Sequence, residues 1–360
     1  MIALFICLAL SVSMVVIGVY AERKVSAFMQ DRMGPMEVGP YGSLQLIADL
    51  LKLIQKENIV PAAADRKLFL LAPYLVFTAV FAGYAVLPLA PDLQGSTTEV
   101  GVFFLLAIVS LDILGILMAG WASNNKYSLF GAMRSVAQII SYEIPLGLSV
   151  LCVVMISQTL DLQQISTQQG IYSAEPIYLF SIKSWGLDMS QVGGIFTWNI
   201  VRMPVLFIVF IIFFIASLAE CNRAPFDMPE AESELVGGFH TEYSGMRWAI
   251  FFLSEYAMML LVSLLGATLF LGGWNTPLPN LGAVRLADWT SGAPGTFWGY
   301  VSGLVWIIAK AYFLIFVQMW IRWTYPRLRV DQLMYLCWKV LTPISLILLF
   351  VVGIWRLLMI

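Results

Sequence analysis

The sequence predicts an all-α integral membrane protein with eight transmembrane helices, one surface amphipathic helix and both ends of the chain on the periplasmic side. Its 360 residues are 60% hydrophobic and only 12% charged, whereas soluble proteins carry roughly 25% charged residues. The apolar residues come in runs of about twenty, which is the length that a helix needs to cross a bilayer. The basic residues gather in alternate loops between those runs.

Eight apolar runs are long enough to span a membrane. They lie at residues 2–20, 69–89, 100–121, 136–158, 200–218, 247–271, 298–320 and 336–357. The first run lacks a preceding basic segment and a small-residue cleavage site, so we interpret it as a retained helix rather than a signal peptide. Residues 1–360 therefore form one polytopic domain, and an even number of crossings puts both ends on one side.

The orientation follows from the basic residues. Fifteen Lys and Arg residues lie in the loops after odd-numbered runs or within the first turn of the run that follows, whereas the loops after even-numbered runs hold only Lys183 and Arg285. Because basic loops stay in the cytoplasm, the odd loops are predicted to face it and both termini to face the periplasm. We expect the inner membrane of a bacterium. The mitochondrial inner membrane is the alternative, since the missing transit-like segment also suits an organelle-encoded product.

The first cytoplasmic loop, residues 21–68, contains a helical stripe over residues 41–55 that is too short to span the membrane. Its apolar positions are Leu44, Ile47, Leu51 and Ile54. It is expected to lie along the membrane surface, or to pack against a soluble partner. Just before it, a turn rich in Gly and Pro follows Arg23 and Arg32, which could position a polar headgroup or serve as ordinary membrane anchors.

The acidic cytoplasmic loop, residues 219–246, is the most informative segment. Its six carboxylates face only Arg223 within the loop, and they are Glu220, Asp227, Glu230, Glu232, Glu234 and Glu242. A helix that begins at Pro229 with Asp227 as its cap would place three of these acids on one face. Like charges so close cannot all be ionised cheaply, so they would share protons. The alternative is a solvated loop that docks onto basic residues of a partner.

Four charged residues lie deep inside apolar runs, far from the ends of the helices, where each costs about 2.5–3.5 kcal/mol on insertion scales. They are Asp112, Glu143, Glu255 and Lys310. Pro145 frees a backbone carbonyl near Glu143, which makes a buried file of water plausible there. The four residues could instead form buried ion pairs, for instance Lys310 with a carboxylate, that fix the helix packing without moving protons.

Several classes of site are excluded by composition. The four cysteines are singletons and the chain has one histidine, so no metal or iron–sulfur ligand set can be assembled. No phosphate-binding glycine motif and no basic stripe are present, which argues against a nucleotide site and against nucleic-acid binding. Any redox centre that acts with this chain must therefore belong to a partner.

The longer motifs resemble one protein family over roughly residues 20–343. They are ERKVSAFMQDRMGP from Glu22, YGSLQLIADLLKLIQKE from Tyr41, ISYEIPLG from Ile140, AECNRAPFDMPEAESELVGGFHTEYSGMR from Ala219, FFLSEYA from Phe251 and WIRWTYPRLRVDQLMYLCWK from Trp320. The family comprises the H subunits of bacterial respiratory complex I and the mitochondrial proteins that correspond to them.

The resemblance implies a membrane component of the proton-translocating NADH-quinone oxidoreductase at the junction of the hydrophilic and membrane arms. It would form the quinone entrance and tunnel, while FMN, the iron–sulfur clusters and the headgroup site lie in hydrophilic-arm partners and small membrane subunits adjoin it. No complete active site is expected on this chain alone. Positions near the quinone tunnel match Arg23, Arg32, Asp49, Arg223 and Phe226. Positions of the acidic coupling path match Glu22, Glu143, Glu220, Asp227, Glu230, Glu232, Glu234, Glu242 and Glu255.

Some residues depart from the family pattern. Met36-Glu37 replaces a part of the tunnel mouth that is usually basic, and Asp112 has no place in the pattern. Two other functions stay open at this point. One is a scaffold that joins the two arms, and the other is the related membrane subunit of an energy-converting hydrogenase. A free-standing transporter is disfavoured, because no repeat or broken-helix pair suggests alternating access.

Overall fold

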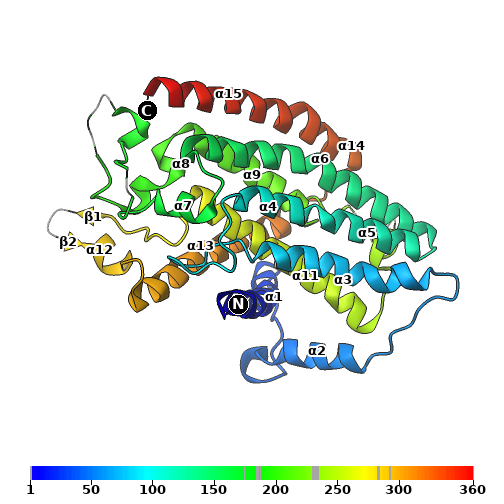
Figure 1. The fold of residues 1–360 in the computed structure, drawn as a ribbon. Coiled ribbons are helices and arrows are strands. Elements are labelled where there is room, and N and C mark those ends of the chain that lie inside the picture. The colour runs from blue at the N-terminus through cyan, green and yellow to red at the C-terminus, as the bar shows by residue number, and fades with distance from the viewer. Residues whose placement is uncertain are drawn as a thin grey trace.

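The computed structural model describes residues 2–173, 175–183, 186, 188–228, 235–281, 284–291 and 293–359. Long helices pack side by side in a bundle, and the short elements gather mainly at one end of it (Figure 1). The long helices are α1 (Ile2–Met29), α3 (Arg66–Gly83), α4 (Gly101–Val109), α5 (Leu111–Ala122), α6 (Lys126–Ser157), α9 (Val205–Glu220), α11 (Gly245–Phe270), α13 (Phe297–Thr324) and α15 (Thr342–Met359).

Short elements connect the long helices. They are η1 (Pro40–Gly42), α2 (Gln45–Gln55), α7 (Leu162–Thr167), η2 (Leu179–Ser181), η4 (Gly194–Thr197), α8 (Asn199–Arg202), η5 (Gly238–His240), α12 (Leu286–Ser291), α14 (Val330–Tyr335) and the π-helical η6 (Leu336–Leu341). The strands β1 (Asn280–Leu281) and β2 (Val284–Arg285) form one antiparallel pair.

Each of the eight predicted apolar runs overlaps a helix. Among the described residues, six helical stretches are long and apolar enough to cross a membrane. They are Arg66–Gly83, Gly101–Ala122, Lys126–Ser157, Gly245–Phe270, Phe297–Thr324 and Val330–Leu358. The apolar helix α9 is shorter, with 16 residues, and the first run lies on the 28-residue α1. The multi-pass, all-helical class is confirmed, whereas the count of eight crossings and the side of each terminus stay predictions.

Helix α11 occupies the centre of the bundle. Every residue from Tyr256 to Phe270 is buried, and the helix packs against α1, α3, α9 and α13. Helix α6 packs against α5, α9 and α15, and it continues through Pro145 without a break. Large apolar side chains such as Phe350 and Leu357 of α15 are exposed, as expected for a surface that meets lipid or other subunits.

The surface helix begins later than the sequence predicted. Helix α2 starts at Gln45 rather than at Tyr41 and ends at Gln55. Tyr41 has a φ of 54° and lies in η1, so the helix cannot extend back through it. Gly42 has a φ of +74°, and a Cβ there would lie 2.1 Å from the carbonyl oxygen of Pro35. The close approach of the backbone to residue 35 therefore fixes the start of the helix.

Helix α2 lies apart from the main bundle (Figure 1). It buries no residue fully, and Ile47, Leu51 and Ile54 of its apolar stripe are about half exposed. The helix reaches α11 and α1 through its other face. An apolar stripe of this kind suits the membrane surface or a soluble partner, so both alternatives remain.

Candidate functional site

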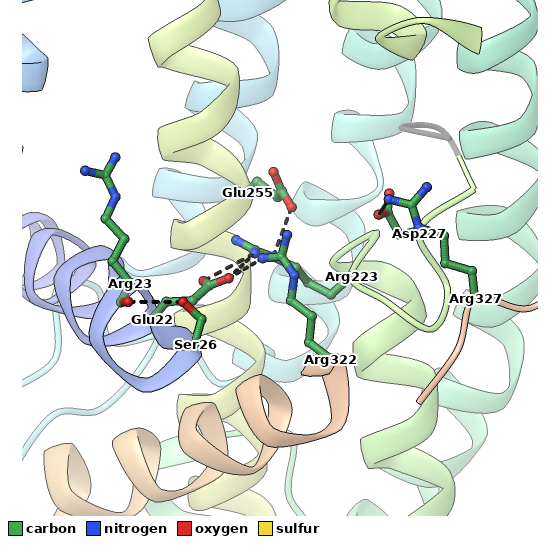
Figure 2. A network of polar contacts seen from close by, with 8 residues as sticks. All are labelled: Glu22, Arg23, Ser26, Arg223, Asp227, Glu255, Arg322 and Arg327. Carbon is green, nitrogen blue, oxygen red and sulfur yellow. Dashed lines mark hydrogen bonds and ion pairs between the residues drawn. The ribbon is translucent and has the colours of Figure 1, made fainter. Parts of the chain in front are cut away.

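The centre of the site is Arg223, a buried guanidinium in the turn that follows α9. Its Nη1 donates to Glu22 Oε1 of α1 at 3.0 Å, and its Nε forms an ion pair with Glu255 Oε1 of α11 at 3.0 Å. Arg322 of α13 also binds the Glu22 carboxylate. The Arg223 guanidinium lies over the Tyr256 ring, 4.2 Å from its centroid. Figure 2 shows the two arginines converging between the two carboxylates.

The charges of this network balance when both carboxylates are ionised. Burial alone would lower the pKa of Arg223, but the negative charges of Glu255 and Glu22 raise it above its ordinary value. The Arg223 and Glu22 side chains are 5% and 6% exposed. Removing one partner of such a buried pair leaves an uncompensated charge and costs about 3–5 kcal/mol. Arg223 therefore joins distant segments of the chain through electrostatics.

A small cavity with both polar and apolar walls adjoins the network at Glu255. Its walls come from α3, α5, α11, η5 and the turn after α9, and its volume is about 40 Å³. One water needs about 10–15 Å³ of such space, so the cavity has room for two or three. Its polar lining is Asp112, Glu220, Cys221, Asn222, His240, Ser254 and Glu255. Glu220 is 6% exposed, and its Oε2 has no hydrogen-bond partner among the described residues.

Glu143 of α6 lies on the far side of this acidic group. Ser110, at the break between α4 and α5, donates its hydroxyl to the Glu143 carboxylate. The charge of Glu143 is near enough to Glu220 to repel it. Glu143 does not line the cavity, so in the described part of the chain the space for water lies beside Glu220 and Glu255. Glu22 and Glu255 thus share Arg223, Glu255 and Glu220 line one cavity, and the charge of Glu143 acts on Glu220; we call these four residues the acidic series.

The remaining predicted acids lie in three different settings. Asp227 is buried and its Oδ2 lies 3.0 Å from Nη2 of Arg327, away from the Arg223 network (Figure 2). Glu242 accepts a hydrogen bond from Asn125 Nδ2 at 2.6 Å. The other acids of the loop, with Pro229, fall within residues 229–234, outside the described residues. The acidic face shared by Asp227, Glu230 and Glu234 therefore stays a prediction, and so does the place of Glu232.

The partners of Lys310 differ from the ion pair that was one alternative for it. The ammonium donates to the carbonyl oxygens of Gly273 and Asn275 at 2.8 and 2.5 Å, not to a carboxylate. It also lies over the Trp198 ring, 4.4 Å from the centroid. Carbonyl dipoles and an aromatic face can stabilise a buried cation without an acid nearby. Lys310 therefore anchors the turn after α11 and takes no part in the acidic series.

The predicted quinone-tunnel residues separate into two groups. Arg23 and Asp49 form an ion pair of 2.5 Å between α1 and α2, and both line a cleft of about 500 Å³ between α1, α2 and α11. Arg32 lies in a neighbouring polar pocket that Arg23 also lines. By contrast, Arg223 sits in the ion network, and Phe226 packs edge-on against Tyr142 with the ring centroids 5.4 Å apart.

The cleft is mostly apolar, with a charged edge. Its apolar lining is Val16, Val19, Leu46, Ile47, Leu50, Leu53, Met246, Trp248, Ala249, Ile250, Phe252 and Leu253. Arg23, Asp49 and Lys52 are its charged members. Partial burial acts to raise the pKa of Asp49, but the hydrogen bond and charge of Arg23 lower it below its ordinary value. The charged edge therefore keeps its carboxylate ionised, beside an apolar wall.

Sequence reasoning missed two arginines of the site. Arg322 and Arg327 were expected only to anchor the cytoplasmic side, yet they bind Glu22 and Asp227 respectively. Both belong to the motif from Trp320 that contributed to the family resemblance. The repeated arginines in that motif were the available signal, since a stretch with several basic residues can supply partners for an unpaired acidic loop.

The fold and the site together define a multi-pass membrane protein with a buried acid–arginine network and an apolar cleft. A family model described as NADH dehydrogenase matches residues 2–353. The second NADH-quinone oxidoreductase H subunit of Cytophaga hutchinsonii is 63% identical over 94% of this chain and 93% of its own length. The corresponding subunits of Chlorobium luteolum and Bacteroides thetaiotaomicron are 53% and 43% identical, over 94% and 96% of this chain and 84% and 88% of their own lengths.

The chain therefore belongs to the NADH dehydrogenase family and, within it, to the H subunits of NADH-quinone oxidoreductase. This confirms the resemblance found in the motifs. Among the described residues, no group of three or more His, Cys, Asp or Glu side chains is placed to hold a metal ion.

Replacing Arg223 by Gln tests the ion network. The amide leaves Glu22 and Glu255 without their shared cation, so we expect stability to fall by about 3–5 kcal/mol and little assembled complex to accumulate. Arg223→Lys keeps the charge but lacks the guanidinium whose separate N–H groups reach both acids, so we expect an intermediate loss of stability. The measurement is the amount of assembled complex on native gels and its temperature of half-inactivation.

The matched control for that variant is Arg285→Gln. Arg285 pairs with Asp288 at 3.6 Å, but its side chain is 75% exposed. Exposed pairs contribute only about 0–1 kcal/mol, so this variant should assemble normally. Equal stability of the Arg223→Gln and Arg285→Gln complexes would contradict the central role of Arg223.

Proposed function

We propose that this protein binds quinone in the cleft between α1, α2 and α11, and that quinone reduction changes the charge felt by the carboxylates around Arg223. Protons then redistribute along the series from Glu22 through Glu255 and Glu220 to Glu143, and on toward neighbouring membrane subunits. In this way electron transfer is coupled to proton translocation. The setting is the inner membrane of a bacterium, with FMN and the iron–sulfur clusters in hydrophilic-arm partners.

One observation carries the proposal: the cleft and the ion network meet at consecutive residues of α1. Arg23 binds Asp49 at the edge of the cleft, whereas Glu22 binds Arg223 and Arg322. Successive residues of a helix point about 100° apart, and Figure 2 shows the two side chains directed to different sides of α1. A charge that arises near Arg23 is therefore one residue away from the buried network.

The cleft suits a quinone in both size and lining. Its volume of about 500 Å³ lies within the roughly 300–1,000 Å³ of small-molecule sites. The apolar wall would accommodate an isoprenoid tail, and the Arg23–Asp49 pair offers polar contacts for the carbonyl oxygens of the headgroup. Quinone accepts two electrons and two protons on reduction, and the clusters of the partner subunits would supply the electrons.

The electrostatic interaction between two charges about 10 Å apart is strong enough to change the protonation of an acid. Two unit charges about 10 Å apart interact by roughly 1.7 kcal/mol at an effective dielectric constant of about 20. Because about 1.4 kcal/mol changes an equilibrium tenfold, such a charge alters the proton occupancy of an acid whose protonated and ionised forms are close in energy. The unpaired Glu220 meets that condition better than Glu22, which two arginines hold in its ionised form.

Narrowing the cleft tests where quinone binds. Ala249 of α11 lines the cleft, and Ala249→Phe should fill part of it. We expect KM for a long-tailed quinone to rise about tenfold, since the lost tail contacts are worth roughly 1–2 kcal/mol, while protons pumped per electron stay unchanged. Ala107→Phe, on the exposed face of α4, is the control and should leave KM unaltered. Equal KM values for the two variants would contradict the binding of quinone in this cleft.

Replacing Glu220 by Gln tests the acidic series. The amide has nearly the same shape but cannot carry a proton, so we expect quinone reduction and proton pumping in the same proteoliposomes to fall together, by about 100-fold. Glu99→Gln, at an exposed position, should behave as the unmodified complex. If the Glu220→Gln complex assembles and pumps at the normal rate, the acids serve assembly only, as in the scaffold alternative.

A further inference from the structure

Asp112 is a partly buried acid that is not a member of the proposed path. It lies in the first turn of α5, inside a predicted membrane run, and its side chain lines the same cavity as Glu220, Glu255 and His240. Its Oδ1 is buried and has no hydrogen-bond partner among the described residues. An acid inside an apolar membrane run is unfavourable unless it is satisfied, so a purely structural role would require a partner for it.

Among the described residues, no ion pair offsets the charge of this acid. Within the described part of the chain, none of the ion pairs includes Asp112 or Glu220. The titratable groups that share the cavity are Glu220, Glu255, His240 and the Cys221 thiol, and Glu255 is already paired with Arg223. The negative charges of Asp112 and Glu143 both act on Glu220. Neighbouring acids without a cation share protons instead of all being ionised.

We propose that Asp112 is a further proton carrier of this protein, sharing a proton with Glu220 through water in the cavity between α5, α11 and the turn after α9. The inference rests on the proposed function, since it adds one residue to the same path. Water donates a proton to one carboxylate while it accepts a proton from the other acid, so the water is left neutral. The volume of about 40 Å³ is sufficient for the two or three waters that this relay uses.

The position of Asp112 also explains how the series reaches Glu143. Ser110 donates to Glu143 at the break between α4 and α5, and Asp112 follows two residues later on α5. A proton held at Asp112 is therefore close in the chain to the residue that contacts Glu143, whereas Glu255 and Glu220 lie on α11 and at the end of α9. Along α5, Asp112 therefore connects the cavity that holds Glu220 with the Ser110 contact to Glu143.

The test uses Asp112→Asn in the assembled complex, reconstituted in proteoliposomes. We expect quinone reduction and proton pumping to fall together by about tenfold, less than the roughly 100-fold of a sole proton carrier because Glu220 and Glu255 remain. Asp112→Glu restores the acid and should recover at least half of the lost rate. Asp92→Asn is the control, because Asp92 is exposed and its φ of 57° also suits Asn.

A second readout follows the proton itself. Infrared difference spectra between the oxidised and reduced complex should show a C=O band of a protonated carboxyl group that disappears in Asp112→Asn and is displaced in Asp112→Glu. If Asp112→Asn does not assemble, the displaced band in Asp112→Glu decides the question. A purely structural acid would leave these bands unchanged.

The outcomes separate this inference from the proposed function. Normal pumping by Asp112→Asn, with every carboxyl band retained and with Glu220→Gln impaired, overturns the role of Asp112 alone. Normal pumping by both variants overturns the acidic path as a whole. A tenfold loss that Asp112→Glu reverses, together with the missing band, supports Asp112 as a proton carrier.

Discussion

The arrangement of the site depends on one buried guanidinium. Arg223 stands 201 positions along the chain from Glu22, and it holds α1 and α11 together at the turn after α9. Because an isolated buried charge is so unfavourable, Arg223 stabilises the ionised forms of Glu22 and Glu255 in the bundle, with Arg322 as a second cation for Glu22. The cavity beside Glu255 exists between elements that this contact fixes, so the unpaired acids Glu220 and Asp112 owe their positions to it.

This constraint separates two kinds of environment on either side of α1. On one side, an apolar cleft with the Arg23–Asp49 pair at its edge offers a site for an amphiphilic ligand. On the other side, Glu22 and Glu255 form ion pairs with Arg223. Glu220 and Asp112 lie beside them, and each has a carboxylate oxygen without a hydrogen-bond partner among the described residues. The paired acids resist a change of protonation and the unpaired ones allow it. Under the proposed function, a change of charge at the cleft would therefore act first on Glu220 and its neighbours across the cavity.

Much of the fold was predictable, because long apolar runs and the high energy of a lone charge in lipid are properties of the sequence itself. The same reasoning singled out Asp112, Glu143 and Glu255. The break at Ser110, the late start of α2 at Gln45 and the partners of Lys310 were not predictable, since each depends on contacts with distant segments. The pairing of Arg223 with both Glu22 and Glu255 required the structure for the same reason. Glu230, Glu232 and Glu234 fall outside the described residues, so their place in the acidic path stays a prediction.

The most direct test of this account is the number of protons pumped per electron, and the rate of quinone reduction, in proteoliposomes that contain the Glu255→Gln complex. Glu255 both binds Arg223 and lines the cavity. In this variant Arg223 keeps Glu22 as a partner, so the account predicts an assembled complex in which both quantities fall. An assembled Glu255→Gln complex that reduces quinone and pumps protons at the unmodified rates would contradict it, and would leave the network as a structural joint between the helices.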